Sequence, residues 1–349
     1  AKFSFMEQWK EYKLGDISNM KYGKLPPKQN NGSYPIWSGY RNVGFATTYN
    51  CRKGTIIVVA RGVGGTGDVK ISSEDCFLTN LSIAVELDNK ICEPLYFYYK
   101  YKLSNLRYLD TGSAQSQITI DDLKRLSLKL PPLEEQKRIT EILSSIDYKI
   151  ELNRRINDNL EQQAQALFKA WFVDNAVIDD ASVSDYFIPL RGKNLLTSDA
   201  KGGEVPVVAG GLTPSAYHNV ANTKAPVITI SASGANAGYV KLWGVPVWSA
   251  DSSYIDSSVT PHIYFWYNLL KFSQKNIFDS QTGSAQPHIY PKHIGDIHIP
   301  NLDLDKVADY NKIVTPIYEQ ITNTQKLNMQ LTVTRDTLLP KLMSGEIKI

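Results

Sequence analysis

The sequence predicts a mixed α/β (α+β) protein made by tandem duplication, in which two globular domains are each followed by a long helix and the two helices pair as a coiled coil. Three observations predict this fold. Residues 133–175 carry a heptad spacing, residues 303–349 repeat it, and the segments before each helix match one another at the same offset of 171 residues. The predicted order is a domain over 1–132, a helix over 133–175, a domain over 176–302 and a helix over 303–349.

The first helix is predicted to begin at Leu133, because Pro131 and Pro132 precede it and Glu134 and Glu135 stand in its first turn. Seam positions then recur at alternating steps of four and three residues, which is the spacing of a coiled coil. A helix of this length would extend about 55 Å at ~1.5 Å per residue, and it needs a partner helix to be stable. The seam residues predicted to make the pairing contacts are Ile139, Leu143, Ile146, Ile150, Asn157 and Leu160.

The partner helix is predicted in the same chain. Its seam repeats that of the first helix step for step, and both seams carry asparagine at the same position, Asn157 and Asn328. A seam asparagine costs stability and fixes the register of a coiled coil. The seam residues predicted here are Tyr310, Val314, Ile317, Ile321, Asn328 and Leu331.

The two globular domains repeat one another as well. Thr111–Gln115 and Thr282–Gln286 both read Thr-Gly-Ser-Ala-Gln, and Gly67-Asp-Val-Lys70 corresponds to Gly238-Tyr-Val-Lys241. Short β-branched runs, 56–59 and 227–230, predict buried strands, and each is followed by a glycine-rich polar loop. Each domain is therefore expected to be a small mixed α/β fold whose loops differ between the copies.

Charge is unevenly distributed although the net charge is only +3. Residues 1–130 contain 18 Lys and Arg against 12 Asp and Glu, whereas residues 131–180 contain 6 against 10. A basic globular surface is typical of nucleic-acid binding, and an acidic helix suits a protein partner.

Several classes of catalytic site are excluded by their missing motifs. Gly62–Gly67 has the glycine spacing of a phosphate loop, but Asp68 and Val69 stand where Lys and Ser or Thr are required. The chain has no Asn-Pro-Pro-aromatic or Asp-Pro-Pro-aromatic stretch, so no adenine methyltransferase centre is expected. It has no HExxH motif and no Cys–His cluster, so no metal site is expected.

The sequence also favours a cytoplasmic protein. The three cysteines are odd in number and lack ligand spacing, which is typical of reduced thiols. No apolar stretch reaches the length of about 18 residues that a membrane span needs, and the N-terminal residues lack an apolar signal core.

Paired polar loops are the remaining candidates for a binding site. Glycines let the main chain approach a ligand closely, Arg can read guanine, and Gln or Asn can read adenine. The alternative is that the Thr-Gly-Ser-Ala-Gln loop is a structural turn in which Ser caps a strand end. The candidate DNA-binding residues are Lys21, Lys24, Arg41, Arg61, Thr66, Ser113, Gln115, Gln117, Tyr217, Ser231, Ser233, Asn236, Ser284, Gln286 and His288.

At this point the chain resembles a known family, the DNA-specificity (S) subunits of type I restriction–modification systems. The resemblance rests on Leu130-Pro-Pro-Leu-Glu-Glu-Gln-Lys-Arg-Ile139, on Leu338-Leu-Pro-Lys-Leu-Met-Ser-Gly-Glu-Ile347, on the repeated Gly-Ser-Ala-Gln and on the loop at Arg61. The second half departs from the family pattern, because Asn301-Leu-Asp-Leu-Asp305 stands where Pro-Pro-Leu-Glu-Glu would open the helix.

The resemblance implies a non-catalytic reader of double-stranded DNA. Each globular domain would be a target-recognition domain for one half of a bipartite target, and the helices would pair antiparallel as a spacer ruler. The implied partners are two modification (methyltransferase) subunits and restriction/translocase subunits, which would carry S-adenosylmethionine, ATP and Mg. Because Arg61 stands opposite Ala232 and Thr66 opposite Ala237, the two half-sites are expected to differ.

Two other functional classes stay open on the sequence. One is a stand-alone enzyme that modifies or cleaves DNA and has fused recognition domains. The other is a coiled-coil scaffold with no role on DNA. Activity on DNA without partner subunits would identify the first class. Failure to bind random DNA in a salt-dependent manner would identify the second.

Overall fold

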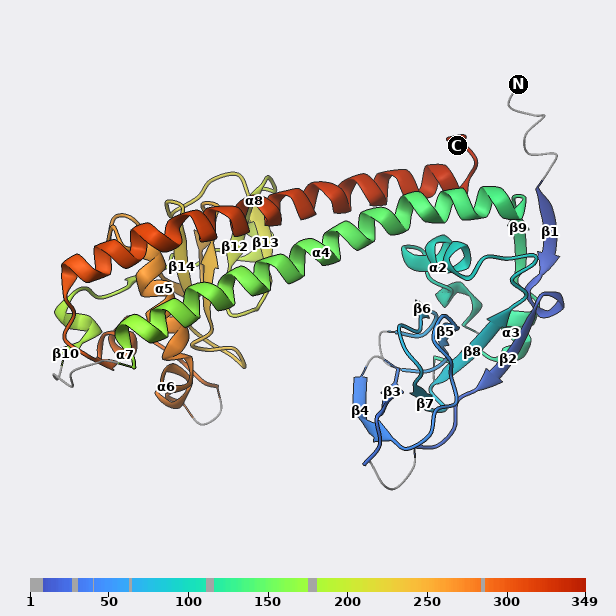
Figure 1. Cartoon of the computed structure of the whole chain (residues 1–349), viewed down its shortest axis with the longest axis horizontal. Helices are drawn as coiled ribbons and strands as arrows, with labels where there is room; N and C mark the ends of the chain where they lie inside the picture. Colours follow the sequence, from blue (N-terminus) through green and yellow to red (C-terminus); the bar gives the residue numbers. More distant parts are fainter. Residues whose placement is uncertain are drawn as a thin grey trace. The chain divides into compact units, whose positions relative to one another are not determined.

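The computed structural model describes residues 9–26, 31–39, 41–62, 65–110, 116–174, 181–283 and 286–349. The chain divides into two compact units, which we call unit 1 (Ala1–Ile150 with Gln330–Ile349) and unit 2 (Glu151–Met329). The two longest helices, α4 (Leu133–Phe172) and α8 (Leu304–Met343), each contribute to both units (Figure 1).

Unit 1 contains two main sheets. An antiparallel sheet has the order β2-β8-β5-β6, with bounds Ser18–Tyr22, Ser82–Leu87, Ile56–Val59 and Val69–Ile71. A smaller sheet has the order β4-β3-β7, with bounds Arg41–Ala46, Tyr34–Ser38 and Phe77–Leu78. A third pair joins β1 (Lys10–Lys13) to β9 (Ser127–Leu130), directly before α4. The helices of the domain are η1 (Leu14–Asp16), α2 (Pro94–Lys102), η2 (Arg107–Leu109) and α3 (Ile120–Lys124).

Unit 2 repeats this topology. Its larger sheet has the order β11-β17-β14-β15, with bounds Leu190–Arg191, Ser252–Ile255, Val227–Ser231 and Val240–Trp243. Its smaller sheet has the order β13-β12-β16, with bounds Ala216–His218, Val205–Val208 and Trp248–Ser249. The pair β10 (Ala181–Ser182) with β18 (His298–Ile299) precedes α8. The helices are η3 (Val183–Asp185), η4 (Thr197–Asp199), α5 (Ile263–Phe272), α6 (Gln274–Asp279) and α7 (Pro291–Gly295).

The strand orders of the two units correspond one to one, so the sequence duplication is also a duplication of topology. The predicted β-branched runs are the central strands β5 and β14, and all of their residues are buried. Such continuous burial agrees with their apolar, non-alternating sequence, because both faces of these strands are covered.

Each long helix is fixed to the globular part of its unit by a side-chain amide. In unit 1 the fully buried Gln136 donates to the carbonyls of Ile91 and Pro131, both at 2.9 Å, and accepts from the Glu93 N–H at 2.9 Å. In unit 2 the Asn311 Oδ1 accepts from two N–H groups at the start of α5, both at 3.1 Å. The amides satisfy main-chain groups that a helix N-terminus leaves without intrahelical partners.

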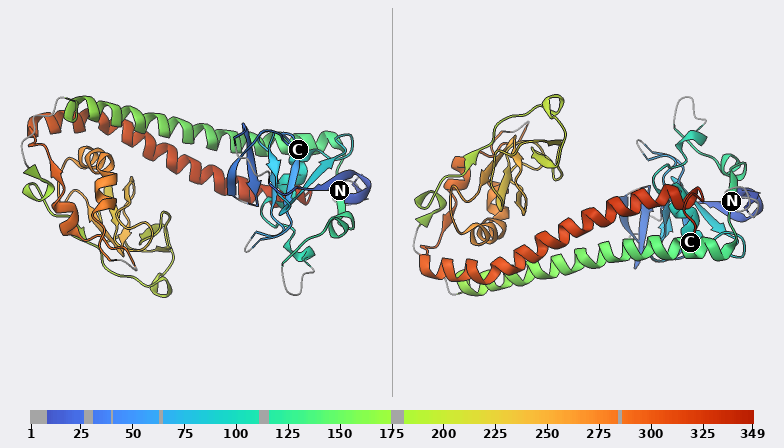
Figure 2. Two further views of the ribbon diagram at one scale, coloured as in Figure 1. Left: turned by 90° about the horizontal axis from the view of Figure 1, so that it is seen from below. Right: turned by 90° about the horizontal axis from the view of Figure 1, so that it is seen from above.

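The helices α4 and α8 contact each other within each unit, and they lie side by side in Figures 1 and 2. In unit 2 the Tyr310 hydroxyl donates to the Ala164 carbonyl at 2.8 Å, and the Asn153 Nδ2 donates to the Asn328 Oδ1 at 2.7 Å. Since the partner number falls as the α4 number rises, the two helices run antiparallel in this unit.

The predicted seam residues face the protein interior. Ile139, Leu143, Ile150, Asn157, Tyr310, Val314 and Ile321 are buried, and Ile146, Leu160, Ile317, Asn328 and Leu331 are half-buried. The expected role of the two asparagines needs correction, because the hydrogen-bond partner of Asn328 is Asn153. The Asn157 Oδ1 is instead buried without a hydrogen-bond partner in the described part of the chain.

Candidate nucleic-acid interface

The two polar loops predicted in the first domain lie next to each other. Arg61 and Gln117 form an antiparallel bridge, and the Ile118 N–H donates to the Ala60 carbonyl at 2.9 Å. The loop that begins at Arg61 is therefore held against the segment that follows Thr111–Gln115. Sequence reasoning named both loops, and the fold brings them together.

The second domain pairs the corresponding loops in the same way. Ser233 and His288 form an antiparallel bridge, the Gly234 N–H donates to the Pro287 carbonyl at 3.1 Å, and the Ile289 N–H donates to the Ala232 carbonyl at 2.9 Å. Gln117 and His288 occupy equivalent positions of the duplication. The pairing of these loops is thus a property of the scaffold, whereas the side chains on it differ.

A carboxylate anchors the loop pair in each domain. Asp110 accepts from the Ser116 hydroxyl at 2.5 Å and from the Gln117 N–H at 2.9 Å. Asp251 accepts from the Ser233 hydroxyl and from Arg191 at 2.7 Å. The loops are therefore ordered turns. Because Gln117 is held through its main chain, the structural and the ligand-binding interpretations of this loop are compatible.

Two of the predicted contact residues are buried and shape the loops instead. Thr66 is 1% exposed, and its hydroxyl donates to the Gly62 carbonyl at 3.1 Å within the same loop. Ser231 is 5% exposed on β14. A side chain that is closed off from solvent in this way cannot reach a base, so both residues leave the set of direct contacts in this conformation.

The other predicted contact residues are accessible to different degrees. Ser233, Asn236, Gln117 and His288 are half-buried, and Ser113, Gln115 and Ser284 lie outside the described residues. The exposed members are Lys21, Lys24, Arg41, Arg61, Tyr217 and Gln286. Exposed basic, amide and aromatic side chains around ordered glycine loops can bind phosphates and base edges.

A third loop joins the pair in the second domain, and sequence reasoning did not name it. This is the turn after β12, which we call the 209–212 turn. The Asn236 Nδ2 donates to the Gly210 carbonyl at 3.3 Å, and the Lys241 Nζ donates to the Leu212 carbonyl at 3.0 Å. The signal was present in the sequence, because lysine is kept at both Lys70 and Lys241 in the repeated Gly-x-Val-Lys segment.

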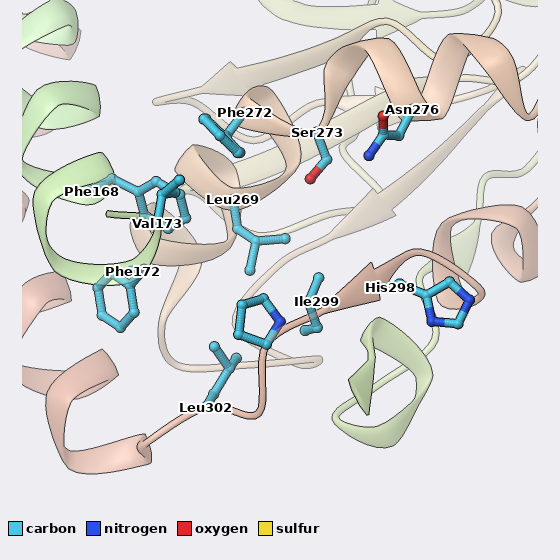
Figure 3. Close-up of a pocket in the computed structure, with 11 residues that line it drawn as sticks. Phe168, Phe172, Val173, Leu269, Phe272, Ser273, Asn276, His298, Ile299 and Leu302 are labelled. Atoms are coloured by element: carbon cyan, nitrogen blue, oxygen red, sulfur yellow. The ribbon is translucent and has the colours of Figure 1, made fainter. Parts of the chain in front are cut away.

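A small apolar cavity of unit 2 lies elsewhere. It has a volume of about 170 Å³ and is bounded mainly by rings and aliphatic side chains from α4, α5 and the β18 segment, such as Phe168, Leu269 and Ile299 (Figure 3). None of the predicted DNA-binding residues lines it. Within the described ranges, no group of three or more His, Cys, Asp and Glu residues could hold a metal ion.

The described helices were also compared with the requirements for crossing a bilayer. Not one of them combines the length and the apolar character that a membrane span requires.

Comparison with known proteins places this architecture among specificity subunits. A model of the type I restriction modification DNA specificity domain matches residues 6–162. The MjaIX specificity subunit of Methanocaldococcus jannaschii is 26% identical over 402 residues, which cover 97% of this chain and 89% of that protein. The HindI specificity subunit of Haemophilus influenzae is 40% identical over 111 residues, which cover 31% of this chain and 24% of that protein.

A solved structure shares the fold of the whole chain. The S subunit of a type I restriction-modification system from M. genitalium superimposes with a TM-score of 0.63 at 24% sequence identity, covering 96% of both chains. The duplicated domain-and-helix architecture is therefore that of a known structural class.

Proposed function

This chain belongs to the family of type I restriction–modification DNA-specificity subunits, and we propose that it reads a bipartite, asymmetric double-stranded DNA target with its two globular domains. The observation that carries the proposal is the repeated pairing of polar loops, Arg61 with Gln117 and Ser233 with His288. Each domain thus presents one ordered loop surface, and the two surfaces carry different side chains. Different side chains on a shared scaffold should read different half-sites.

The chain acts in this proposal as a recognition subunit without catalytic residues of its own. Adenine methylation would be performed by two modification subunits with S-adenosylmethionine, and cleavage by restriction/translocase subunits with ATP and Mg. This role places the protein in the cytoplasm with its DNA target. The domain limits are those of the sequence duplication, with recognition domains over 1–132 and 176–302.

Exposed apolar residues on the long helices support the docking of two modification subunits. Ile142 on α4 and Ile313 on α8 are 36% and 46% exposed, and they are equivalent in the duplication. Ile156 and Leu327 form a second equivalent pair, each 41% exposed. Exposed apolar side chains that recur at equivalent positions fit two copies of one partner, because each copy would meet the same surface.

The docking proposal is tested by the stoichiometry of the complex. Ile142→Lys and Ile313→Lys should each reduce the number of bound modification subunits from two to one, which native mass spectrometry or light scattering measures. Val333→Lys is a matched control, because Val333 is 66% exposed but corresponds to the polar Gln162. Complexes that keep two modification subunits in both isoleucine variants would contradict the docking surface.

The paired helices are proposed to form an antiparallel coiled coil that sets the distance between the half-sites. Deleting one heptad from each helix, residues 151–157 and 322–328, should preserve the seam and shorten the pair by about 10 Å at ~1.5 Å per residue. That length corresponds to about 3 base pairs at ~3.4 Å each. Methylated adenines mapped in a genome carrying the variant should show the shorter spacer. An unchanged spacer would reject the ruler, and a palindromic motif in the parent protein would reject the asymmetric target.

A further inference from the structure

A lysine is repeated at the same place in both recognition domains. Lys70 lies on β6 and Lys241 on β15, which are equivalent edge strands of the two larger sheets. Their other strand neighbours differ, since Asp68 corresponds to Tyr239. The shared lysine therefore calls for an explanation that holds in both domains.

In both domains the lysine reaches the turn that leaves the smaller sheet. The Lys70 Nζ donates to the Gly39 carbonyl at 3.4 Å, directly after β3. The Lys241 Nζ donates to the Leu212 carbonyl at 3.0 Å, in the turn after the equivalent strand β12. Each lysine thus connects the edge of the larger sheet to a turn of the smaller sheet.

Both ammonium groups give up part of their solvent to make this contact. Lys70 and Lys241 are half-buried, and burial lowers the pKa of each of them. The Lys241 Nζ also lies 4.1 Å from the centre of the Trp243 ring, which holds the ammonium group over an aromatic face. A lysine that serves only for solubility would remain extended in water.

The turn held by Lys241 is packed onto the loops already described. Gly210 accepts from Asn236 of the glycine-rich loop, and a Cβ at position 210 would lie 2.6 Å from the Ser233 carbonyl oxygen. Ser233 is in turn bridged to His288. The 209–212 turn, the glycine-rich loop and the loop before His288 are therefore one connected surface.

We propose that the turn after the first strand of each smaller sheet is a third DNA-reading element, and that Lys70 and Lys241 are positioning residues that hold it against the other two loops. The inference rests on the proposed function. In the second domain the turn presents Leu212, which is 49% exposed and suits an apolar contact with a thymine methyl group. In the first domain the same turn leads to the exposed Arg41, which suits guanine or a phosphate.

The competing role for these lysines is direct contact with a phosphate, and the two roles predict different results. A phosphate contact lowers affinity for all sequences alike and reduces the salt slope of binding by about one when it is removed. A positioning role changes which base pairs are accepted, and it leaves the salt slope unchanged because no phosphate contact is lost.

The experiment uses Lys241→Met in the full chain, assembled with its modification subunits. Lys241→Arg is the conservative variant, because it keeps a donor on a stem of similar length. Lys224→Met is the charge control, because Lys224 is exposed in the same domain and makes its printed contact to Asp256 through its main-chain N–H. Thermal melting of each variant first establishes that the fold is retained.

The readout is the methylation motif, resolved by half-site, together with DNA affinity as a function of salt. Lys241→Met should lose about tenfold discrimination at one or two positions of one half-site, with the other half-site and the salt slope unchanged and with recovery in Lys241→Arg. Lys70→Met should relax the opposite half-site. A uniform loss of affinity with a reduced slope, or an unchanged motif, would overturn the inference. A parent protein without any bipartite motif would instead refute the proposed function itself.

Discussion

Replacing Asp147 with asparagine tests how the first recognition domain is fixed to the long helices. Asp147 lies on α4 and accepts hydrogen bonds from Tyr99 and Lys102 of α2, both at 2.8 Å. It also accepts from Arg335 of α8 at 2.6 Å. One carboxylate therefore joins three helices of unit 1, and Asp147→Asn removes its charge while keeping its shape.

The expected cost follows from the burial of the network. The side chains of Asp147, Lys102 and Arg335 are 28%, 19% and 13% exposed. Breaking a fully buried ion pair costs about 3–5 kcal/mol, whereas an exposed pair is worth about 0–1 kcal/mol. Arg335 keeps a second partner, Asp336, at 2.7 Å. We therefore expect a loss of about 2 kcal/mol, which lowers the Tm of a unit of this size by about 4–8 °C.

The cost should depend on pH in a definite direction. Burial acts to raise the pKa of Asp147, but the hydrogen bonds from Lys102, Arg335 and Tyr99 outweigh it and leave the pKa below its usual range. A depressed carboxylate pKa contributes stability above the unfolded value of about 3.9, and this stability is lost as the pH falls through the folded value. The difference between the parent protein and Asp147→Asn should therefore shrink below about pH 4.

Calorimetry and urea unfolding of the full chain between pH 7 and pH 3 measure this difference. Glu151→Gln is the control on the same helix, because Glu151 is 49% exposed and pairs only with the exposed Arg154 and Arg155 in the described part of the chain. The control should change stability by less than about 0.5 kcal/mol. A loss in Asp147→Asn no larger than that of the control, or one that stays constant over this pH range, would refute the reasoning.

Three further substitutions test other contacts. Arg61→Ala should weaken or relax one half-site by about 1–3 kcal/mol if Arg61 contacts a base, and an unchanged motif and affinity would remove it from the interface. Tyr310→Phe should cost about 1–2 kcal/mol in urea unfolding, because it leaves a buried carbonyl of α4 without its 2.8 Å hydrogen bond. Gln136→Ala should cost about 3 kcal/mol, because three buried hydrogen bonds are lost at once; a cost below about 1 kcal/mol would mean that solvent replaces them.

The sequence was sufficient to predict the long helices, their duplication and the adjacency of the polar loops. Heptad spacing is strongly periodic, and a constant offset of 171 residues over many segments fixes which elements correspond. The corresponding strand orders of the two units confirm the mixed α/β duplication. These features follow from patterns that extend over many residues, so single exceptions do not obscure them.

The sequence was insufficient for features that depend on the path of one turn. Thr66 was expected on the surface, but Gly67 takes φ +92° and its carbonyl accepts from the Leu106 N–H at 2.7 Å, which closes the loop over the threonine. The lysine contacts to the two turns join strands from different sheets, and neither spacing nor composition shows which sheets are neighbours. Side-chain burial at such places follows from tertiary packing.

The register of the helix pair could also not be inferred from the matched asparagines. Residues that are equivalent by duplication face each other in an antiparallel pair only at the point where the pseudo-two-fold axis crosses the seam. Asn157 and Asn328 are equivalent but lie away from that point, so Asn328 meets Asn153 instead. The ring of Trp171 lies 6.1 Å from that of Tyr310, which is the same register 18 residues further along each helix.

This register places Asn157 opposite Thr324, one step beyond the contact between Asn153 and Asn328. Both residues are buried, at 9% and 6% exposure, but the Asn157 Oδ1 has no hydrogen-bond partner in the described chain and the Thr324 hydroxyl accepts from Gln320. The duplication has thus kept an amide pair on one side of its axis and an amide facing a hydroxyl on the other. Thr324→Asn should restore the second amide pair and stabilise the protein by about 1 kcal/mol, since asparagine and threonine have similar helix propensities.

A double-mutant cycle with Asn157→Val isolates that interaction from any intrinsic effect of the new asparagine. The gain from Thr324→Asn should be present in the parent background and absent when Asn157 is valine, because valine offers no acceptor. Equal effects in both backgrounds would show that Asn157 and position 324 do not form a pair, and the register drawn from Asn153 and Trp171 would then not hold between them. A confirmed pair would establish that the same antiparallel register runs from Asn153 to Trp171 on α4, and hence that deleting equivalent heptads from both helices keeps every seam contact beyond the deletion in place.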